Sequence, residues 1–465
     1  MQGPIYLTAD IRRIEQAAGG APLMQRAGAA AAELAATLAS EKSKDILVLA
    51  GPGNNGGDAL IAAEILKKNF FRVEVVKRPE ALPEGKHWGL VIDGLFGIGL
   101  TRPIEGDYAK LVDYANRQGC PVLALDMPSG IQSDTGQALG KAVRATHTIT
   151  FIALKPGLLT LDGPDHCGEV SVAELGLDVK ALLPPSAWVA GPQLFKAALN
   201  PRPRNFHKGL AGSLGILGGA AGMTGAALLA GRAALKLGAG KVYVGFLEQD
   251  SIEVDPAAPE LMLRHADDVL GLDLDAVLAG PGLGQGERAE TLVGAALASE
   301  IPCVLDADAL NLLSQSEMLR KTCVHRSAET LVTPHPAEAA RLLGSTVANV
   351  QENRVKAARL LAENLNAHAV LKGNGSVLAT RDGQWFINTS GNPGMASAGM
   401  GDVLAGMLGA LLAQRYSGEA ALVLGTHLHG AAADALVTAG TGPVGLTASE
   451  LIDPARRIWN GWLSQ

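Results

Sequence analysis

The sequence predicts two α/β domains in a single chain, each built on a largely parallel sheet. The chain has 465 residues, which is more than one ordinary hydrophobic core supports. Both halves alternate short apolar runs with helical patterns, a rhythm typical of βαβ units. Proline-rich stretches at 184–186 and 201–204 interrupt regular structure between the halves. We therefore place the boundary near residue 200, with domains 1–200 and 201–465.

In the N-terminal half, four apolar runs predict strands at 46–50, 73–76, 90–93 and 122–126. A helix is expected after Asp58, between the first two runs. Ahead of them, Thr8 is a good cap for a helix over 9–18. The alanine-rich segment 24–39 predicts a second helix.

The C-terminal half repeats this style, with strands expected near 214–217, 242–244, 276–279, 303–306 and 369–372. The run 209–231 carries no charge and was considered as a membrane span. Its repeated glycines predict instead a strand, a glycine loop and a helix. We see no sequence repeat between the two halves.

Composition excludes some functions. A formal net charge of −7 gives no basic footprint for DNA or RNA. The four cysteines form no C-x-x-C pair and have no histidines at zinc spacing, so reduced buried thiols are expected. The first turns carry Asp10, Arg12, Arg13 and Glu15, unlike the apolar core of a signal peptide. We expect a cytoplasmic homo-oligomer with no nucleic-acid or membrane partner.

The segment 392–402, N-P-G-M-A-S-A-G-M-G-D, combines a small-residue turn with one carboxylate at an expected helix start. Asp402 opens an apolar run, so the amides of Gly399, Met400 and Gly401 should lie at a helix N-terminus. Such amides bind anions, and glycines let a phosphate approach the backbone. Asp402 as a simple N-cap is the plain alternative.

The segment 51–56 spells G-x-G-x-x-G after a strand, so a dinucleotide-binding dehydrogenase was considered. That pattern needs an acidic residue at the end of the second strand, where this chain has Val76-Lys77-Arg78. The loop is also unusually polar. The dehydrogenase reading is therefore weak.

Polar residues also follow two other strands of the N-terminal half, namely Asp93, Asp126 and Ser129. Open α/β sheets bind their ligands at this edge, so these residues should share one crevice with the Asn54–Asp58 loop. Carboxylate, amide and hydroxyl oxygens suit K⁺ or Mg²⁺ better than zinc. The alternative for each aspartate alone is a helix cap.

Short motifs in the C-terminal half resemble the ribokinase-like superfamily and, within it, the NAD(P)H-hydrate dehydratases. In chain order they are His207-Lys208-Gly209, Gly218-Gly219, Gly222-Met223-Thr224-Gly225-Ala226, Gly280-Pro281-Gly282-Leu283-Gly284, Leu305-Asp306-Ala307-Asp308, Thr333-Pro334-His335-Pro336-x-Glu338, Lys372-Gly373 and Gly401-Asp402. In the N-terminal half, Asn54-Asn55-Gly56-Gly57-Asp58 resembles NAD(P)H-hydrate epimerase. The whole chain thus resembles the bifunctional NAD(P)H-hydrate repair family. The resemblance implies a Rossmann-like three-layer sandwich followed by a ribokinase-like α/β domain.

For the N-terminal domain, the resemblance implies epimerisation of R- and S-NAD(P)HX, the hydrated forms of NADH and NADPH. It makes Asn55, Asp93 and Ser129 ligands of K⁺, and Asp126 a catalytic and substrate-binding carboxylate. The implied substrate loops are Asn54, Asn55, Gly56, Gly57 and Asp58, and Gly97, Ile98, Gly99, Leu100, Thr101, Arg102 and Pro103. Lys155 is expected to assist or to be a solvated surface charge. Family members often have glycine where this chain has Ala59.

For the C-terminal domain, the resemblance implies dehydration of S-NAD(P)HX to NAD(P)H at the expense of ADP or ATP, with ADP preferred and Mg²⁺ present. Asp402 is the implied catalytic base and touches substrate. The implied nucleotide-binding residues are Lys372, Gly373, Asn374, Gly375, Ser376 and Gly401, and the substrate walls are Ala226, Gly282, Gly284, His335 and Asn392. Met400 replaces the alanine or threonine common in the superfamily, but its amide remains available.

Several roles stay open at this point. Asp306 and Asp308 either organise Mg²⁺ or cap a helix, and His335 as a lone histidine is equally a structural residue. Two other functions were weighed: a ribokinase-like small-molecule kinase with an N-terminal dinucleotide-binding regulatory module, and an N-terminal domain that binds without catalysis.

Overall fold

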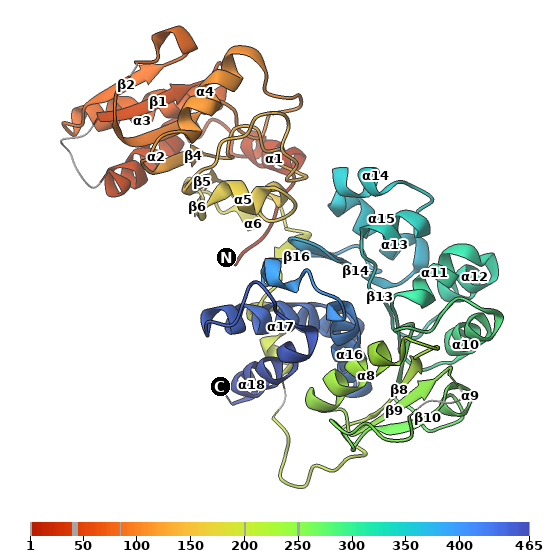
Figure 1. Ribbon diagram of the computed structural model, residues 1–465. Coiled ribbons are helices and arrows are strands. Elements are labelled where there is room, and N and C mark those ends of the chain that lie inside the picture. Colours follow the sequence, from red (N-terminus) through yellow and green to blue (C-terminus); the bar gives the residue numbers. More distant parts are fainter. Residues whose placement is uncertain (1, 40–44, 84, 200, 249–251, 465) are drawn as a thin grey trace. The chain divides into compact units, whose positions relative to one another are not determined.

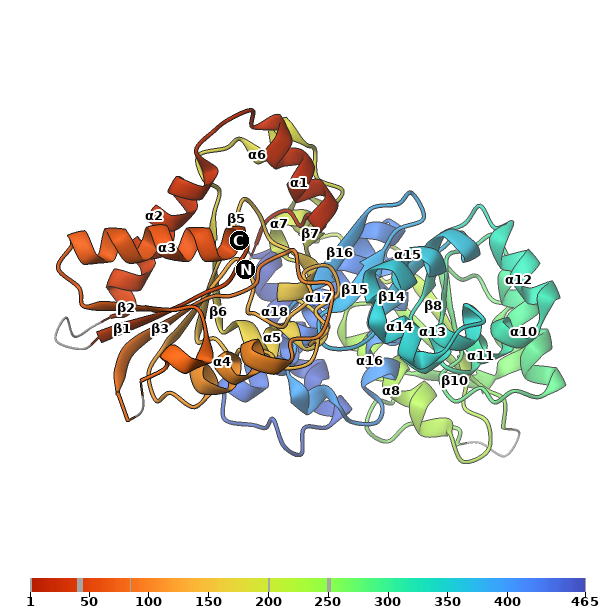
Figure 2. The same cartoon turned by 90° about the horizontal axis from the view of Figure 1, so that it is seen from above.

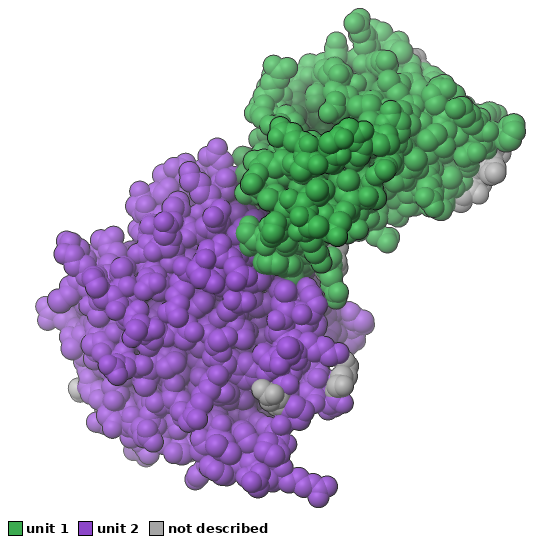
Figure 3. Space-filling model, turned by 180° about the vertical axis from the view of Figure 1, so that it is seen from behind, with its two compact units in different colours: residues 1–189 green, residues 190–465 purple. Residues whose placement is uncertain are grey.

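The computed structural model describes residues 2–39, 45–83, 85–199, 201–248 and 252–464. It divides into two compact units, Met1–Val189 and Ala190–Gln465 (Figure 3). The division falls ahead of the predicted residue 200, because the segment after Val189 packs within the second unit. The ring centroid of Phe195 lies 5.2 Å from that of Trp462 and 6.0 Å from that of His427. The prolines at 201–203 therefore lie inside the second unit.

The first unit is a parallel sheet with helices on both faces. Its strands are β1 (Asp45–Ala50), β2 (Val73–Val76), β3 (Trp88–Gly94), β4 (Val122–Leu125), β5 (His147–Phe151) and β6 (Glu169–Ala173), in the order β2-β1-β3-β4-β5-β6. The short strand β7 (Ala187–Val189) ends the residue range of this unit and is not part of this sheet. Its helices are α1 (Thr8–Ala17), α2 (Leu23–Leu38), α3 (Asn54–Lys68), α4 (Gly106–Asn116), α5 (Gly163–Cys167) and α6 (Val179–Leu182).

Alternation along β1 explains the two helical layers of this unit. Ile46 and Val48 pack into a cluster with residues of α1, α2 and α3. Leu47 and Leu49 point to the opposite face and pack with residues of α4. Successive side chains of a strand point to opposite faces, so an uninterrupted apolar run produces a sheet buried on both sides. Figure 2 shows α2 and α3 on one face of β1 and β3, with α4 on the other.

The second unit is a larger mixed sheet, visible in Figure 1. Its strands are β8 (Ser213–Gly218), β9 (Lys241–Phe246), β10 (Met262–His265), β11 (Ala276–Ala279), β12 (Cys303–Leu305), β13 (Thr330–Val332), β14 (His368–Leu371), β15 (Ser376–Ala379) and β16 (Trp385–Asn388). They lie in the order β10-β9-β8-β11-β12-β13-β14-β15-β16. Pairing is parallel from β10 to β14 and antiparallel from β14 to β16.

The helices of the second unit are α7 (Pro192–Phe195), α8 (Thr224–Lys236), α9 (Ala266–Val269), α10 (Glu287–Ala298), α11 (Asp308–Gln315), α12 (Glu317–Val324), α13 (Pro336–Leu342), α14 (Val347–Glu352), α15 (Arg354–Leu365), α16 (Met400–Ala413), α17 (Gly418–Thr438) and α18 (Ile452–Leu463). The run 209–231 forms β8, a glycine loop and α8, as predicted. Among described helices, α17 alone is long and apolar enough to cross a membrane, and most of it is buried in this unit.

Helix α16 is the central helix of the second unit. Every residue from Val403 to Ala413 is buried, as expected of a helix that is apolar all round. It packs against α8 with backbones in close approach, because a Cβ built on Gly406 would lie 2.1 Å from the carbonyl oxygen of Ala230. The start of α16, where Asp402 lies, is thereby fixed against the core.

We predict that Gly406→Ala lowers the free energy of unfolding of the second unit by about 1–3 kcal/mol, because the added methyl must push α16 away from α8. Chemical denaturation measures it. The matched control is Gly294→Ala in α10, where the nearest neighbour of a new Cβ, Leu319, is at an ordinary 3.5 Å. Helix propensity should make that variant more stable by about 0.5–1 kcal/mol. Equal stability of the two variants would contradict the packing argument.

Candidate active sites

Each unit brings two glycine-containing loops together where the strand order reverses. In the first unit this point lies between β1 and β3, and in the second between β8 and β11. A Cβ on Gly51 would lie 1.8 Å from the oxygen of Leu95, and one on Gly218 would lie 2.2 Å from that of Pro281. Only glycine permits these approaches. Ligands of open α/β sheets bind at such reversal points, so both are candidate sites.

The first site is a cavity of about 570 Å³. Its lining includes Asn54, Asn55 and Asp58 of the first turn of α3, Gly97–Leu100 of the loop after β3, and Asp126 and Lys155. Residues 54–58 were expected to precede the helix, but α3 begins at Asn54 because the extended Gly53 is already its N-cap. A new Cβ on Gly56 would meet the Gly51 oxygen and one on Gly57 the Met24 sulfur, so both glycines face the protein. Thr101, Arg102 and Pro103 continue the loop beyond the lining.

Asp126 and Lys155 form a buried ion pair at the ends of β4 and β5. Lys155 is 0% exposed, so it is not a solvated surface charge. Its Nζ donates to Asp126 Oδ1 at 2.5 Å, to Thr150 Oγ1 at 2.8 Å and to the Phe151 oxygen at 2.7 Å. These three acceptors use all three ammonium protons. Lys155 therefore positions Asp126, whose φ of 65° turns the chain sharply after β4.

Two of the predicted cation ligands, Asp93 and Ser129, are in direct contact, although neither is among the residues that line the cavity. Asp93 is fully buried and accepts from the Ser129 hydroxyl at 2.6 Å and the Ser129 amide at 2.8 Å. Burial raises the pKa of Asp93 to about 6, a sign that nothing in the protein fully compensates its charge. Asn55 is 7% exposed, and neither its amide oxygen nor its amide nitrogen has a partner among the described residues. One carboxylate with amide and hydroxyl oxygens fits a hard cation of low charge.

Two more carboxyl groups share this cavity. Burial, then the charges of Asp126 and Glu15, raise the pKa of Asp58 to about 7. The pKa of Glu15 is raised overall, because burial and the charge of Asp126 outweigh the opposing charges of Lys155 and Arg12. Glu15 was not predicted as a site residue, because it lies in α1, ahead of every motif in the sequence. Its signal is only an acidic residue one turn after the buried Ile11.

The second site lies at the start of α16. Gly399 is its N-cap with φ of 84°, so the amides of Met400 and Gly401 belong to the first turn of a helix, where they have no intrahelical acceptor. Asp402 is half-buried there, and burial followed by the charge of Asp306 raises its pKa to about 6. A carboxylate with a pKa near neutral suits a general base. Asp402 is the third residue of α16, so the alternative that it is a simple N-cap is wrong.

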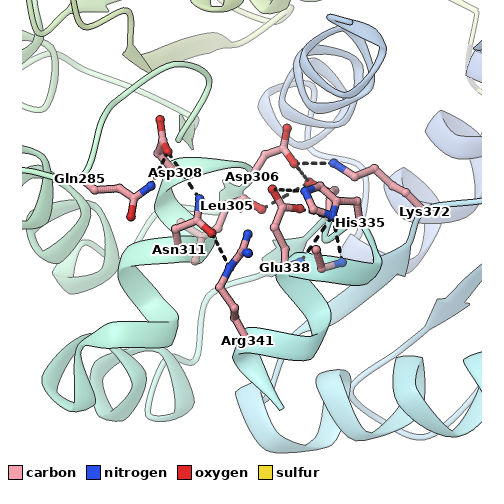
Figure 4. A network of polar contacts seen from close by, with 11 residues as sticks. Gln285, Leu305, Asp306, Asp308, Asn311, His335, Glu338, Arg341 and Lys372 are labelled. Atoms are coloured by element: carbon pink, nitrogen blue, oxygen red, sulfur yellow. Dashed lines mark hydrogen bonds and ion pairs between the residues drawn. The ribbon is translucent and has the colours of Figure 1, made fainter. Parts of the chain in front are cut away.

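A second ion pair, between the partly exposed Lys372 and the buried Asp306, lies beside this helix start. Lys372 Nζ donates to Asp306 Oδ1 at 2.9 Å, as Figure 4 shows, and the Thr333 hydroxyl donates to the same oxygen at 2.7 Å. A Cβ on Gly401 would lie 3.2 Å from Lys372 Nζ. The pair thus lies against the first turn of α16. Because its carboxylate accepts from Lys372 and Thr333, Asp306 does not cap the helix α11.

Histidine 335 has a structural role that the sequence left open. Its Nδ1 accepts from the amides of Ala337 and Glu338, and its own amide donates to Glu338 Oε2 at 2.8 Å, a capping box at the start of α13. Burial, with Lys372 and Arg341, lowers the pKa of His335, so the ring is neutral at pH 7. The ring remains exposed beside Asp306 and Lys372 (Figure 4).

Three of the predicted wall residues, Ala226, Gly282 and Gly284, lie at the reversal between β8 and β11. A Cβ on Gly282 would lie 3.3 Å from Cβ of Ala226, and Gly282 has φ of 59°. The amide of Gly284 donates to Asp308 Oδ2 at 2.8 Å, and Gln285 donates to Oδ1 (Figure 4). Asp308 thus holds the loop after β11 onto the start of α11. No group of three or more His, Cys, Asp or Glu side chains suited to a metal occurs among the described residues.

The expected nucleotide loop, Lys372–Ser376, is the turn between β14 and β15. Arg354, buried in α15, donates to the carbonyl oxygens of Leu371 and Lys372 at 3.1 and 3.2 Å. Burial lowers the pKa of Arg354 to about 10. Two further residues missed from the sequence lie on α17. Asp434 accepts from Gly391 and Asn392, and His429, whose pKa is lowered to about 4 by burial and then by Lys372, lies close to Met400.

Comparison with known proteins covers both units. Residues 214–456 match the family described as NAD(P)H-hydrate dehydratase. Residues 20–89 and 77–157 match the family described as YjeF-related protein N-terminus. A bifunctional NAD(P)H-hydrate repair enzyme of Escherichia coli strain K12 is 38% identical over 500 residues, which cover 98% of this chain and 94% of that protein.

Two solved structures resemble the second unit. The ADP/ATP-dependent NAD(P)H-hydrate dehydratase of Bacillus subtilis, co-crystallised with ATP and Mg²⁺, is 30% identical with a TM-score of 0.52 over 59% of this chain and 98% of that chain. A ribokinase-like superfamily protein of Enterococcus faecalis V583, 22% identical with a TM-score of 0.51 over 60% of this chain and 96% of that chain, supports the fold alone. The predicted ribokinase-like fold of the second unit is therefore confirmed.

We predict that Lys155→Met destabilises the first unit by about 3–5 kcal/mol, because it leaves the Asp126 carboxylate buried without its cation. Calorimetry on the full chain measures this from the transition of the first unit. The matched control is Lys110→Met, which breaks only the exposed pair with Asp107 and should leave that transition in place. If both variants unfold like the unsubstituted chain, Lys155 does not support Asp126.

Proposed function

The chain belongs to the family of bifunctional NAD(P)H-hydrate repair enzymes, and from that membership we propose how its two candidate sites divide the work. The family combines an epimerase with a nucleotide-dependent dehydratase. We assign the epimerase site to the cavity of Met1–Val189 and the dehydratase site to the start of α16. A dehydratase that accepts one epimer leaves the other unrepaired, so the two activities belong together.

In the dehydratase site, the hydroxyl of S-NAD(P)HX must leave its ring carbon, and hydroxide is a poor leaving group. We propose that Asp402 takes the hydroxyl proton as the oxygen attacks the terminal phosphorus of ADP or ATP, whose bond to the departing AMP or ADP breaks. The ring carbon–oxygen bond then breaks with its electron pair going to phosphate. Loss of a proton from the neighbouring carbon forms the double bond of NAD(P)H.

The position of Asp402 is the observation that carries this proposal. Its carboxyl has a pKa of about 6, at a helix start whose amides attract anions, next to the Lys372–Asp306 pair. Base, anion site and cation are the parts that phosphoryl transfer requires. The loop Lys372–Ser376 and Gly401 are proposed to hold the nucleotide. Ala226, Gly282, Gly284, His335 and Asn392 are proposed to line the pocket for the nicotinamide ring.

The nucleotide is proposed to enter with Mg²⁺, by analogy with the Bacillus subtilis enzyme that was co-crystallised with ATP and Mg²⁺. Magnesium would neutralise phosphate charge when bound. Near this site the carboxylates of Asp306 and Asp308 are already engaged with Lys372 and Gly284. We propose that ADP is the preferred nucleotide and that the protein is a cytoplasmic homo-oligomer.

In the epimerase site, Asp126 is proposed to be a catalytic carboxylate that contacts the substrate, held in place by Lys155. K⁺ is proposed to bind Asn55, Asp93 and Ser129. The unpaired amide of Asn55 and the uncompensated charge of Asp93 both suit a cation. When bound, K⁺ would offer a phosphate or hydroxyl oxygen of the substrate one positive charge. Residues 54–58 and 97–103 are proposed to surround that substrate.

The direct test is to incubate the chain with mixed NADHX epimers, KCl, MgCl₂ and ADP or ATP while following reduced cofactor and inorganic phosphate together. We expect complete recovery with equal phosphate release. Asp402→Asn should abolish recovery, whereas Asp126→Ala should limit fast recovery to the S epimer. Accumulation of a stable phosphorylated product would instead favour the small-molecule kinase.

We predict that K⁺ raises the melting temperature of the first unit more than equal concentrations of Na⁺, because binding to the folded state alone stabilises it. Asn55→Ala should remove the difference between the two salts. Asn69→Ala, the same change at an exposed position at the end of α3 and outside the cavity lining, serves as the control variant. Equal melting temperatures in KCl and NaCl for the unsubstituted chain would contradict the cation site.

A further inference from the structure

Helix α1 contributes to the epimerase cavity although it lies outside the matched family segments, which begin at residue 20. Ile11, Arg12 and Glu15 of α1 line the cavity together with Asp58, Asp126 and Lys155. Residues 11 and 15 are one turn apart and share a helix face, so Glu15 follows the buried Ile11 along the cavity wall, where its own side chain is exposed. Neither the motifs nor the comparisons assign Glu15 a role.

Tertiary contacts hold α1 in place. The amide and hydroxyl of Thr8, its first residue, donate to Asp134 Oδ1 at 2.7 and 2.8 Å, so an aspartate far along the chain caps the helix. The amide of Tyr6 donates to the oxygen of Leu154, the residue before Lys155. Ile14 is fully buried. The position of Glu15 is therefore defined relative to the Asp126–Lys155 pair.

The charges around Glu15 make its carboxyl a proton-exchanging group. The ionisable side chains lining the cavity are Arg12, Glu15, Asp58, Asp126 and Lys155. Three carboxyls thus face two cations, and Lys155 is fully engaged by Asp126, Thr150 and Phe151. Burial and the charges of Asp126 and Glu15 raise the pKa of Asp58 to about 7, so Glu15 acts on the protonation of Asp58. The unpaired, buried Asn55 in the same lining indicates that a polar ligand belongs here.

We propose that Glu15 is a further catalytic residue of the epimerase, which works with Asp58 as an acid–base pair on the substrate hydroxyl. This inference depends on the proposed epimerase function of the cavity. Asp126, held by Lys155, then acts as the fixed negative charge that stabilises the cationic intermediate described next. Neither carboxyl of the pair is bonded to Lys155, whose three ammonium protons go to Asp126, Thr150 and Phe151.

The reaction begins when the protonated carboxyl of the pair donates its proton to the hydroxyl on the ring carbon. The carbon–oxygen bond then breaks with its electrons on oxygen, and water departs. The lone pair of the ring nitrogen forms a carbon–nitrogen double bond. Water then adds to the opposite face of that carbon and loses a proton to the carboxylate partner, and the electrons return to nitrogen. One proton has moved between Glu15 and Asp58, and exchange between them resets the site.

The test measures R-to-S exchange from pH 5 to 9 with the full chain, using NMR on purified epimers without nucleotide. We expect Glu15→Gln to slow exchange by about 10²-fold. The exchange rate that remains should fall on the alkaline side of the pH profile, its alkaline limb, at a lower pH than in the unsubstituted chain. The limb moves to lower pH because Asp58 must be protonated to act as the acid, and removing the negative charge of Glu15 lowers the pKa of Asp58. Glu15→Asp should retain part of the rate and keep the limb near its original position.

The matched control is Glu33→Gln, the same chemical change on an exposed position of α2 away from the cavity, and it should alter neither rate nor limb. The melting temperature of the first unit reports folding of each variant. An unchanged rate and limb in folded Glu15→Gln would overturn the inference while leaving the epimerase in place. Exchange no faster than the uncatalysed rate in the unsubstituted chain would instead overturn the proposed function of this unit.

Discussion

A lysine–aspartate pair at the carboxyl edge of a parallel sheet, with its aspartate buried, is the interaction on which both sites depend. In the first unit Asp126 follows β4 and Lys155 follows β5; in the second unit Asp306 follows β12 and Lys372 follows β14. Removing one partner of such a pair leaves an uncompensated charge in a poorly solvated place, so each pair constrains its surroundings. Parallel pairing brings these strand ends to one edge, and the order reversal opens room for a ligand there. Fold and chemistry are therefore linked by the same few side chains.

Each pair also sets the behaviour of a neighbouring carboxyl. Asp58 lies near Asp126, and Asp402 near Asp306; in both, burial is the main cause of a raised pKa and the negative charge of the neighbour is the next. One carboxylate is thus paired with a lysine, while the pKa of a second is raised toward neutral. Environments that separate two carboxyl groups in this way assign them different roles. Two domains with different sheets and different proposed reactions use the same electrostatic arrangement.

The sequence predicted those features that depend on local pattern and not those that depend on distant partners. Continuous apolar runs predicted β1, β8 and β11, and the small-residue turn before Asp402 predicted the start of α16. β13 has three residues and β5 reads H-T-I-T-F, so neither gave a clear run. Lys155 looked equally like a surface charge because its acceptor at Asp126 is 29 positions away in sequence. Glu15, Arg354 and His429 stand in ordinary helical patterns, and only the tertiary structure places them at a site.

The central claim is that the second unit removes the hydroxyl by first making it part of a phosphate. Oxygen-18 placed in the ring hydroxyl of S-NADHX tests this most directly, with mass analysis of the products of one turnover. If the hydroxyl oxygen attacks phosphorus and the carbon–oxygen bond then breaks, the label must appear in inorganic phosphate. Label released in water, with unlabelled phosphate formed alongside it, would show that the hydroxyl leaves directly and would contradict the role given to Asp402.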